Sequence, residues 1–264
     1  MVILFLGDVV GEPGRCALYR AIPELREEYG VDAVVVNGEN AAGGKGIIPR
    51  LAREFMEHGV DVITLGDHVW DQSDLIPWLP EAPNVLRPFN LQPGTPGHGS
   101  CIIDTPAGRL GVLCLQGRTF MRPGAENPYT QGYDEARRLR EAGAQVVLVD
   151  FHGETTSEKI AMGYRMDGVA SAVIGTHTHV QTGDERILPG GTAYLTDAGM
   201  CGSRDGVIGR DAGCVLQGLI TNMPNRFPIA GFPAMVNGVI VEVDTATGKA
   251  LRMERVIRAY DEEK

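Results

Sequence analysis

The sequence predicts an α/β protein built from alternating strands and helices. Three observations lead to this prediction: apolar segments of strand length recur along the chain, segments with helical periodicity lie between them, and polar residues directly follow five of the apolar segments. The chain has 264 residues, of which 43% are hydrophobic, so one hydrophobic core can serve it. We therefore expect a single domain over residues 1–264.

The predicted strands are short apolar runs bounded by turn-forming or charged residues. They are Val2–Leu6, Ala33–Val36, Val60–Leu65, Leu110–Leu115, Gln145–Phe151, Ala172–Gly175 and Thr192–Thr196. A closing hairpin is predicted from Gly238–Val243 and Leu251–Ile257, which a threonine-rich turn through Gly248 joins. An acidic tail is expected from Asp261.

The predicted helices carry charges on part of their period and are followed within a few residues by glycine. They are Gly14–Tyr29, Pro49–His58, Tyr133–Ala142 and Thr156–Met166. Helices in these places fit crossover connections between parallel strands. Two stretches rich in proline, glycine and polar residues, 83–106 and 222–237, are predicted to be long surface connections.

Composition excludes several classes of protein. The net charge of −10, with no cluster of lysine or arginine, opposes binding to long nucleic acids. No apolar run approaches the ~20 residues that a membrane span requires. Five cysteines without a Cys-x-x-Cys pair suggest neither a disulfide framework nor a thiolate zinc site. Since the first residues also lack the features of a secretory signal, we expect a cytoplasmic protein.

Polar residues cluster at the ends of five predicted strands. The clusters are Gly7–Asp8, Asn37–Asn40, Gly66–His68, Asp150–Gly153 and Gly175–His179. In open α/β sheets, functional groups collect beyond the carboxyl ends of the strands, so these clusters are expected to meet at one edge. Four of the six histidines fall within them, whereas His58 and His98 are assigned structural roles.

The residue types in these clusters indicate a metal centre. Carboxylate oxygens and neutral imidazole nitrogens suit zinc, manganese or iron. Seven donors are too many for one open catalytic ion, so we expect two ions that share a bridging carboxylate. His177 and His179 would point to opposite faces of a regular strand, so they lie on a loop or bind different ions. The candidate ligands are Asp8, Glu39, Asn40, Asp67, His152, His177 and His179.

With these motifs the chain resembles the calcineurin-like metallophosphoesterases, and among them the YmdB-like cyclic-nucleotide phosphodiesterases. The resemblance extends from Gly7 to Gly209 and is carried by Gly7–Gly11, Asn37–Gly44, Phe151–Lys159 and Thr196–Met200. It implies a four-layer α-β-β-α fold, in which helices flank a sandwich of two sheets. It further implies a dinuclear centre, with iron first and manganese or zinc as alternatives, and hydrolysis of 2′,3′- or 3′,5′-cyclic nucleotides.

The resemblance also implies a role for each candidate residue. It puts Asp8, Asn40 and His179 on one ion and Asp67, His152 and His177 on the other, with Glu39 between them. His68 is left to contact the substrate and to protonate the leaving group, and Asn40 also faces the substrate. A metal-bound hydroxide would then attack the phosphorus atom.

The motif Gly66-Asp67-His68 departs from the family pattern, which has asparagine where this chain has Asp67. The extra negative charge leads to a hypothesis: this chain binds divalent metal more tightly but attracts an anionic phosphodiester less strongly, or it favours a mixed-valence pair of ions.

Several alternatives stay open. The chain could be a general phosphomonoesterase, a nucleotide-sensing regulator with slow turnover, or a cysteine hydrolase that uses Cys201. The glycine-rich turn 42–46 could offer backbone N–H groups to a phosphate beside Lys45. The segment 200–209 and the arginine that follows it, Arg210, could form a substrate loop, a structural turn or a subunit contact. The expected partners are a small nucleotide or phosphate ester and, on base rates, a second copy of the chain.

Overall fold

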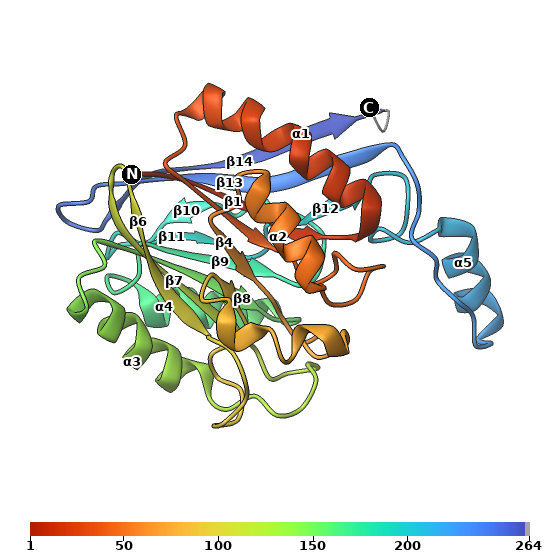
Figure 1. The fold of residues 1–264 in the computed structure, drawn as a ribbon, viewed down its shortest axis with the longest axis horizontal. Helices are drawn as coiled ribbons and strands as arrows, with labels where there is room; N and C mark the ends of the chain where they lie inside the picture. The colour runs from red at the N-terminus through yellow and green to blue at the C-terminus, as the bar shows by residue number, and fades with distance from the viewer. Residues whose placement is uncertain (262–264) are drawn as a thin grey trace.

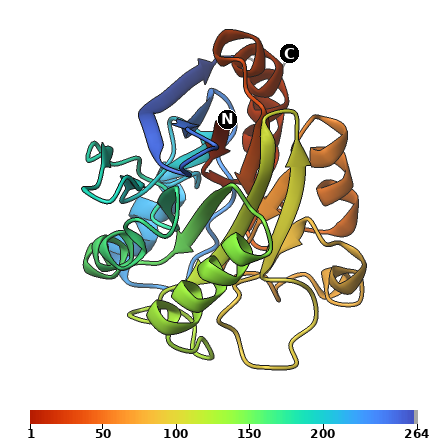
Figure 2. The same ribbon diagram turned by 90° about the vertical axis from the view of Figure 1, so that its left-hand side faces the viewer.

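The computed structural model describes residues 1–261 and has four layers, with two sheets packed face to face between two layers of helices (Figure 1). Within these residues, one sheet has eight strands and the other has six. Figure 2 shows the helices on the two outer sides of the sandwich. This architecture confirms the α/β prediction and the two-sheet sandwich that the resemblance implies.

The first sheet joins the beginning of the chain to its end. Its strands lie in the order β2 (Asp8–Val9), β12 (Met200–Ser203), β13 (Ala234–Val243), β1 (Val2–Leu6), β3 (Ala33–Asn37), β4 (Val62–Thr64) and β5 (Val85–Leu86). β14 (Ala250–Tyr260) pairs with β13 and forms the predicted hairpin. β1, β3, β4 and β5 are parallel, whereas β13 is antiparallel to β1.

The second sheet comes from the middle of the chain. Its strands lie in the order β10 (Arg186–Ile187), β11 (Ala193–Leu195), β9 (Ala172–Thr176), β8 (Val146–His152), β7 (Gly108–Gln116) and β6 (Ser100–Thr105). β7, β8, β9 and β11 are parallel. The carboxyl ends of β8 and β9 therefore lie together, with His152 paired to Thr176.

The helices cover the outer faces of the sheets. α1 (Gly11–Tyr29) and α2 (Pro49–Glu57) pack on the first sheet, and α3 (Pro128–Glu141) and α4 (Thr156–Met166) pack on the second. Short 3₁₀ turns lie at Ser73–Leu75 and Leu79–Glu81. α5 (Ala212–Thr221) belongs to neither layer and projects from the body (Figure 1).

Successive side chains of each strand point to opposite faces of the sheet, and the apolar side chains on both faces form the core. Leu4 and Leu6 of β1 face α1 and α2, while Ile3 and Phe5 face the second sheet. The same alternation in β8 sends Val147 toward α3 and α4. Since both faces of each sheet are buried, the central strands are nearly continuous apolar runs.

The structure corrects several predicted boundaries. α3 begins at Pro128 rather than Tyr133, because the side chain of Asn127 accepts a hydrogen bond from Tyr129 N at 3.0 Å and caps the helix. α1 begins three residues before Gly14, at Gly11. The stretch 83–106 is not one long connection, because it contains β5 and β6, and β6 pairs with β7 along its whole length.

The second predicted connection, 222–237, is correct only in its first part, because β13 begins at Ala234. α5 was not predicted. Of the acidic tail from Asp261, residues 262–264 lie outside the described residues. Within residues 1–261, no helix combines the length and the apolar character needed to cross a membrane.

Candidate metal centre

Four candidate ligands meet where the carboxyl ends of strands from both sheets come together. Glu39 and Asp67 follow β3 and β4 of the first sheet, while His152 ends β8 and His177 follows β9 of the second. Their four ligand atoms all lie within 4.8 Å of one another. His152 Nε2 is 3.1 Å from Glu39 Oε1 and 3.3 Å from Asp67 Oδ1, and His177 Nδ1 is 3.0 Å from His152 Nε2. The predicted meeting of strand ends therefore occurs, and the assignment of these residues as ligands stays a prediction.

The other three candidates, Asp8, Asn40 and His179, lie next to this cluster. Asn40 Oδ1 is 3.2 Å from His179 Nε2, and Asp8 Oδ2 accepts a hydrogen bond from His177 N at 3.1 Å. Asp8 is fully buried, and its Oδ1 has no hydrogen-bond partner among the residues that the structure describes. A buried carboxylate oxygen left without a partner is expected of a metal ligand. Asp8, Asn40 and His179 could therefore offer further donors beside the cluster.

The two histidines of the Gly175–His179 segment lie on a loop. β9 ends at Thr176, and the φ angles of His177 and His179 are 100° and 66°. This backbone differs from that of a strand, so the loop explanation of their spacing is correct. Positive φ at a residue other than glycine is strained and needs support from the surrounding structure.

A buried ion pair gives that support. Lys159 Nζ of α4 donates to Asp197 Oδ2 at 2.6 Å, and the side chains of both residues are 1% exposed. Asp197 Oδ2 also accepts from Thr178 N at 3.1 Å and Thr178 Oγ1 at 2.8 Å, between the two histidines. Two motifs of the family resemblance, Phe151–Lys159 and Thr196–Met200, thus meet to hold the histidine loop.

A second buried carboxylate orients His152. Thr176 Oγ1 donates to Asp150 Oδ1 at 2.7 Å and lies 2.9 Å from His152 Nδ1. Because the threonine proton is used on Asp150, His152 Nδ1 is the donor to Thr176, and Nε2, which faces Glu39 and Asp67, is the nitrogen that would bind a metal ion once it has lost its proton. Thr64 and Asn37 also donate to Asp150. Such partners commonly orient metal-binding histidines.

Electrostatics favours a cation in this cluster. Burial, with His152 nearby, lowers the pKa of His177 to about 4, and burial lowers the pKa of His179, so both rings are neutral at pH 7. Burial opposes charging of His152, but the carboxylates of Glu39 and Asp67 outweigh it and raise the pKa of the ring well above its ordinary value. The cluster thus attracts positive charge, and its oxygen and nitrogen donors fit a divalent transition metal.

Four of the seven candidate ligands line a cavity of about 330 Å³. The residues that line it are Glu39, Asn40, Gly44, His68, Glu154, His177, Thr178, His179, Ile208 and Arg210. His68 therefore faces the same space as the candidate ligands. Its Nδ1 is 2.8 Å from Asp71 Oδ2 and 2.9 Å from Arg122 Nη2, so Nε2 is the ring nitrogen left to serve a substrate.

Arg122 is the main site residue that the sequence did not indicate. Its Nε lies 3.4 Å from Asp67 Oδ2, and its Nη1 lies 2.5 Å from Asp71 Oδ1. The extra negative charge of Asp67, which departs from the family pattern, therefore has a compensating guanidinium. Glu154 is a further addition, with Oε2 at 3.2 Å from His177 Nε2. Arg122 lies in an irregular connection more than fifty residues from Asp67, so no local pattern could have found it.

Gly66 explains how donors from two sheets approach so closely. A Cβ atom at this position would overlap the carboxylate of Glu39 and the ring of His152. Only glycine leaves room there.

The structure changes two hypotheses about phosphate binding that were drawn from the sequence. In the turn 42–46, the N–H groups of Ala42, Gly44 and Lys45 donate to carbonyls of residues 40–46, so they are not free for a phosphate. Of the two arginines in residues 200–210, the segment that could form a substrate loop, Arg210 lines the cavity, whereas Arg204 pairs with Asp205 and Asp261.

The cysteine-hydrolase alternative is not supported. Cys201 is fully buried, its Sγ lies 3.6 Å from Asn237 O, and burial raises the pKa of its thiol to about 12. It is therefore neither accessible nor ionised. The remaining histidines have structural contacts, as predicted: His58 stacks on Tyr19, and His98 Nε2 lies 3.2 Å from Pro80 O.

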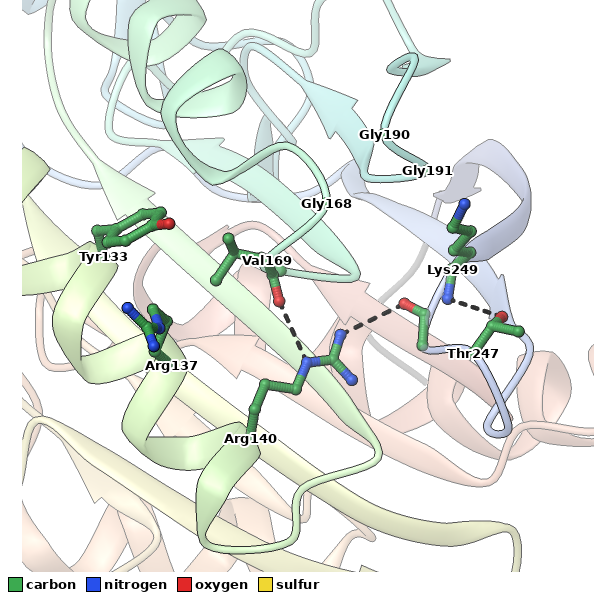
Figure 3. A pocket seen from close by; sticks show the side chains of 11 residues that line it. Tyr133, Arg137, Arg140, Gly168, Val169, Gly190, Gly191, Thr247 and Lys249 are labelled. Atoms are coloured by element: carbon green, nitrogen blue, oxygen red, sulfur yellow. Dashed lines mark hydrogen bonds between the residues drawn. The ribbon is translucent and has the colours of Figure 1, made fainter.

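A second cavity, of about 340 Å³, lies at the opposite ends of the strands, where β8, β9 and β11 begin (Figure 3). Arg140 lines it but donates to the backbone carbonyls of Val169, Gln145 and Gly248 and to Ser171 Oγ. Its guanidinium thus joins the ends of the strands, and none of the residues that line this cavity is a candidate metal ligand.

The fold and the site together define a calcineurin-like metallophosphoesterase. Residues 4–256 match the family of YmdB-like proteins, and the chain belongs to this family. The 2′,3′-cyclic-nucleotide 2′-phosphodiesterase of Bacillus subtilis is 43% identical over 257 residues, which cover 97% of each chain.

Two solved structures share the whole fold. A hypothetical protein from Thermus thermophilus superposes with a TM-score of 0.90 at 39% identity, covering 98% of this chain and 100% of that one. A novel phosphatase from Mycoplasma pneumoniae superposes with a TM-score of 0.92 at 32% identity, covering 99% and 94%. The family membership inferred from the motifs is confirmed.

Proposed function

We propose that this protein is a metal-dependent phosphodiesterase that hydrolyses cyclic nucleotides, with 2′,3′-cyclic nucleotides as its expected substrates and 3′,5′-cyclic nucleotides as further ones. The observation that carries the proposal is the set of four donor atoms within 4.8 Å of one another, two of which belong to residues that line the cavity, Glu39 and His177. The similarity to the Bacillus subtilis enzyme over nearly the whole chain supports the choice of substrate.

The proposed ligands fall into two sets with one residue shared. Asp67, His152 and His177 would hold one ion, and Asp8, Asn40 and His179 the other, with Glu39 between them. The unpartnered oxygen of Asp8 and the short distance between Asn40 and His179 support the second set. We expect iron, with manganese or zinc as alternatives, and a cytoplasmic setting that suits five cysteines without a disulfide among the described residues.

Side chains around the centre would perform the other steps. Bound divalent ions would lower the pKa of a water molecule and neutralise charge on the phosphoryl oxygens. Asn40 and Arg210 face the cavity and would orient the phosphate, with Arg210 supplying positive charge in a strongly acidic protein. His68, oriented by Asp71 and Arg122, would give a proton from Nε2 to the departing oxygen.

A phosphomonoesterase is the second candidate, because the structural relative from Mycoplasma pneumoniae is described as a phosphatase. The same centre can hydrolyse a phosphomonoester or a phosphodiester, so kinetics on both types of substrate must distinguish the two candidates. We expect kcat/KM for 2′,3′-cyclic AMP to exceed that for p-nitrophenyl phosphate by at least about tenfold, equivalent to ~1.4 kcal/mol of transition-state stabilisation.

The test combines metal analysis with kinetics on one preparation made without chelator. We expect nearly two transition-metal ions per chain and hydrolysis of 2′,3′-cyclic AMP. His152→Ala should lose both, while His58→Ala, which changes a histidine far from the site, should keep both. A metal-free wild-type protein, or a His152→Ala variant with full activity, would contradict the proposal. A preference for p-nitrophenyl phosphate would favour the phosphomonoesterase.

A further inference from the structure

We propose that the second cavity, which lies between α3 and the turn that joins β13 to β14, binds a small anion that carries a phosphate group. This site, the α3 cavity, has a volume of about 340 Å³ and is lined by Tyr133, Arg137 and Arg140 of α3 and by residues 168–170, 190–191 and 247–249 (Figure 3). The ligand would bind apart from the candidate metal centre, so this inference does not depend on the phosphodiesterase reaction.

Three positively charged side chains line the α3 cavity, whereas no carboxylate of residues 1–261 does. Arg137 and Arg140 follow Tyr133 at spacing i, i+4 and i+7, so the three side chains share one side of α3. Lys249 comes from the opposite side of the cavity, as Figure 3 shows. In a protein with a net charge of −10, three cations around one cavity give a local positive potential, which attracts an anion.

Arg140 is a half-buried cation that no anion neutralises. Its guanidinium donates to Val169 O at 3.1 Å, to Ser171 Oγ at 2.9 Å and to Gly248 O at 3.4 Å. Among residues 1–261 it forms no ion pair with a carboxylate. Burial lowers the pKa of the guanidinium, and no neighbouring negative charge offsets this effect. The oxygens hold the group in place but leave its full charge, so it can attract an anion in the cavity.

The carboxylates near the α3 cavity are engaged elsewhere or exposed to solvent. Asp167 accepts hydrogen bonds from Gly190 N at 2.8 Å and from Thr192 N at 3.3 Å. Glu141 lies 3.6 Å from Arg137, but the two side chains are 70% and 59% exposed, so solvent weakens this pair. Arg137 can therefore turn toward a ligand at little cost.

Glycines leave room for the cations in the wall of the cavity. A Cβ atom at Gly248 would overlap the guanidinium of Arg140, and one at Gly191 would come within 2.8 Å of Lys249 Cγ. The φ angles of Gly248 and Gly191, 72° and 101°, also favour glycine. Lys249 forms no ion pair with a carboxylate of residues 1–261, so its ammonium group is available to a ligand. The backbone thus places two charges at a cavity that it keeps open.

Size and hydrogen-bond donors favour a phosphate group as the part that is recognised. A volume of about 340 Å³ suits a molecule of the size of a mononucleotide rather than a polymer. Guanidinium groups bind phosphate oxygens through paired hydrogen bonds, and a doubly charged phosphate matches several cations. The N–H groups of Gly168 and Gly190 already donate to Thr192 Oγ1 and Asp167 Oδ2, so the charged side chains would supply the donors.

The α3 cavity is separate from the candidate metal centre. It lies where β8 begins, whereas His152 ends that strand. β8 has seven residues, so its two ends are roughly 20 Å apart. A ligand in one site does not contact the other, and binding to the two sites can be measured separately.

Isothermal titration calorimetry of the full, metal-loaded chain tests the proposal, with inorganic phosphate and AMP as probes. The double variant Arg137→Gln, Lys249→Gln removes two exposed cations and leaves Arg140 to join the strand ends. It should raise the dissociation constant of the α3 cavity for either probe at least about tenfold, because charge-assisted hydrogen bonds are lost. The control Arg50→Gln, Arg53→Gln, which removes the same charge from exposed positions on α2, should bind as the wild type does.

The His152→Ala background separates the α3 cavity from the metal centre. Anion binding that remains in this background should disappear when Arg137→Gln and Lys249→Gln are added. A lower dissociation constant for AMP than for phosphate would identify a nucleotide as the ligand, and equal values would identify free phosphate. Both results support the proposal.

Hydrogen exchange localises the ligand. Amides of α3 and of residues 244–249 should exchange more slowly when AMP is bound, whereas amides of α2 should not change. Unchanged exchange in the central strands of the double variant shows that it is folded. Equal binding of both probes by the wild type and the double variant, or an equal loss in the α2 control, would overturn the proposal.

Discussion

Asp67 and Arg122 form a charge pair at the edge of the candidate centre. Because Arg122 Nε lies 3.4 Å from Asp67 Oδ2, the guanidinium and a bound metal ion would compete for the negative charge of the same carboxylate. Arg122 is 44% exposed, so solvent reduces the strength of this competition. The earlier hypothesis on Asp67, that its extra charge tightens metal binding, must therefore include the arginine.

Double substitution at this pair gives a prediction. Asp67→Asn should weaken metal binding about tenfold, because an ionic ligand becomes neutral. Arg122→Gln should tighten metal binding about threefold when Asp67 is present and should have no effect in the Asp67→Asn variant, since contacting residues couple by ~0.5 kcal/mol or more. Competition with a coloured chelator measures both affinities. Equal effects of Arg122→Gln in the two backgrounds would rule out the coupling, and Arg118→Gln on the same loop serves as control.

At the residue scale, the strand-end motifs predicted which side chains come together but not what orients them. Asp8, Glu39, Asp67, His152 and His177 could be found because each follows an apolar run. The contacts that orient them come from distant parts of the sequence. Asp150, which orients His152 through Thr176, accepts a hydrogen bond from Thr64, eighty-six residues earlier. Such contacts depend on sheet order, which local patterns do not contain.

At the scale of elements, α4 and the histidine loop act as one unit. Lys159 of α4 neutralises Asp197, and Asp197 binds the backbone and hydroxyl of Thr178 between the two histidines. The neighbouring Glu158 carboxylate accepts from the N–H groups of Arg118 and Thr119, at the start of the loop that carries Arg122. One helix thus positions two loops of the site.

The buried lysine allows a stability prediction. Lys159→Met should lower the free energy of unfolding by about 3–5 kcal/mol, because Asp197 would remain buried without a cation. Urea unfolding of the metal-free protein measures the loss separately from metal binding. Lys249→Met, on an exposed lysine, should change the value by less than about 0.5 kcal/mol. If both substitutions have the same small effect, the ion pair does not stabilise the fold.

Elements with a clear period were predicted best. α4 and β1 have the expected bounds, and the C-terminal hairpin is confirmed. β6 was missed because the glycines and prolines before it suggested a long connection, and its strand conformation depends on pairing with β7. α5 was missed because it has no charged residues to mark a polar face. Asp211 as the N-cap and Asn222 as the left-handed C-cap could nevertheless have indicated the two ends of a helix.

On the scale of the whole molecule, the candidate centre joins the two sheets. Glu39 and Asp67 come from the first sheet, and His152 and His177 come from the second. A metal ion bound by all four would therefore act as a cross-link between the layers. The face-to-face packing of the two sheets was predicted from the family resemblance. Hydrophobic periodicity alone predicts that strands and helices alternate, but it does not give the order of the strands in each sheet.

Metal removal should therefore lower thermal stability. At a metal concentration 100 times the dissociation constant, binding adds about 2.7 kcal/mol to the folded state. For a chain of this size, that corresponds to a fall in Tm of roughly 5–10 °C on adding chelator. Scanning calorimetry with and without chelator measures it, and His152→Ala should show no chelator effect. An unchanged wild-type Tm would mean that the sheets do not share an ion.

The pairing of β1 with β13 sets the order in which the site can be completed during protein synthesis. Phe5 lies opposite Val239, and the N–H groups of Gly7 and Asp8 donate to the carbonyls of Asn237 and Gly199. Asp8 thus precedes by about 190 and 230 residues the two residues, Gly199 and Asn237, that hold its backbone in place. A chain that has not been synthesised past Asn237 therefore lacks a complete centre, so hydrolysis requires synthesis beyond that residue.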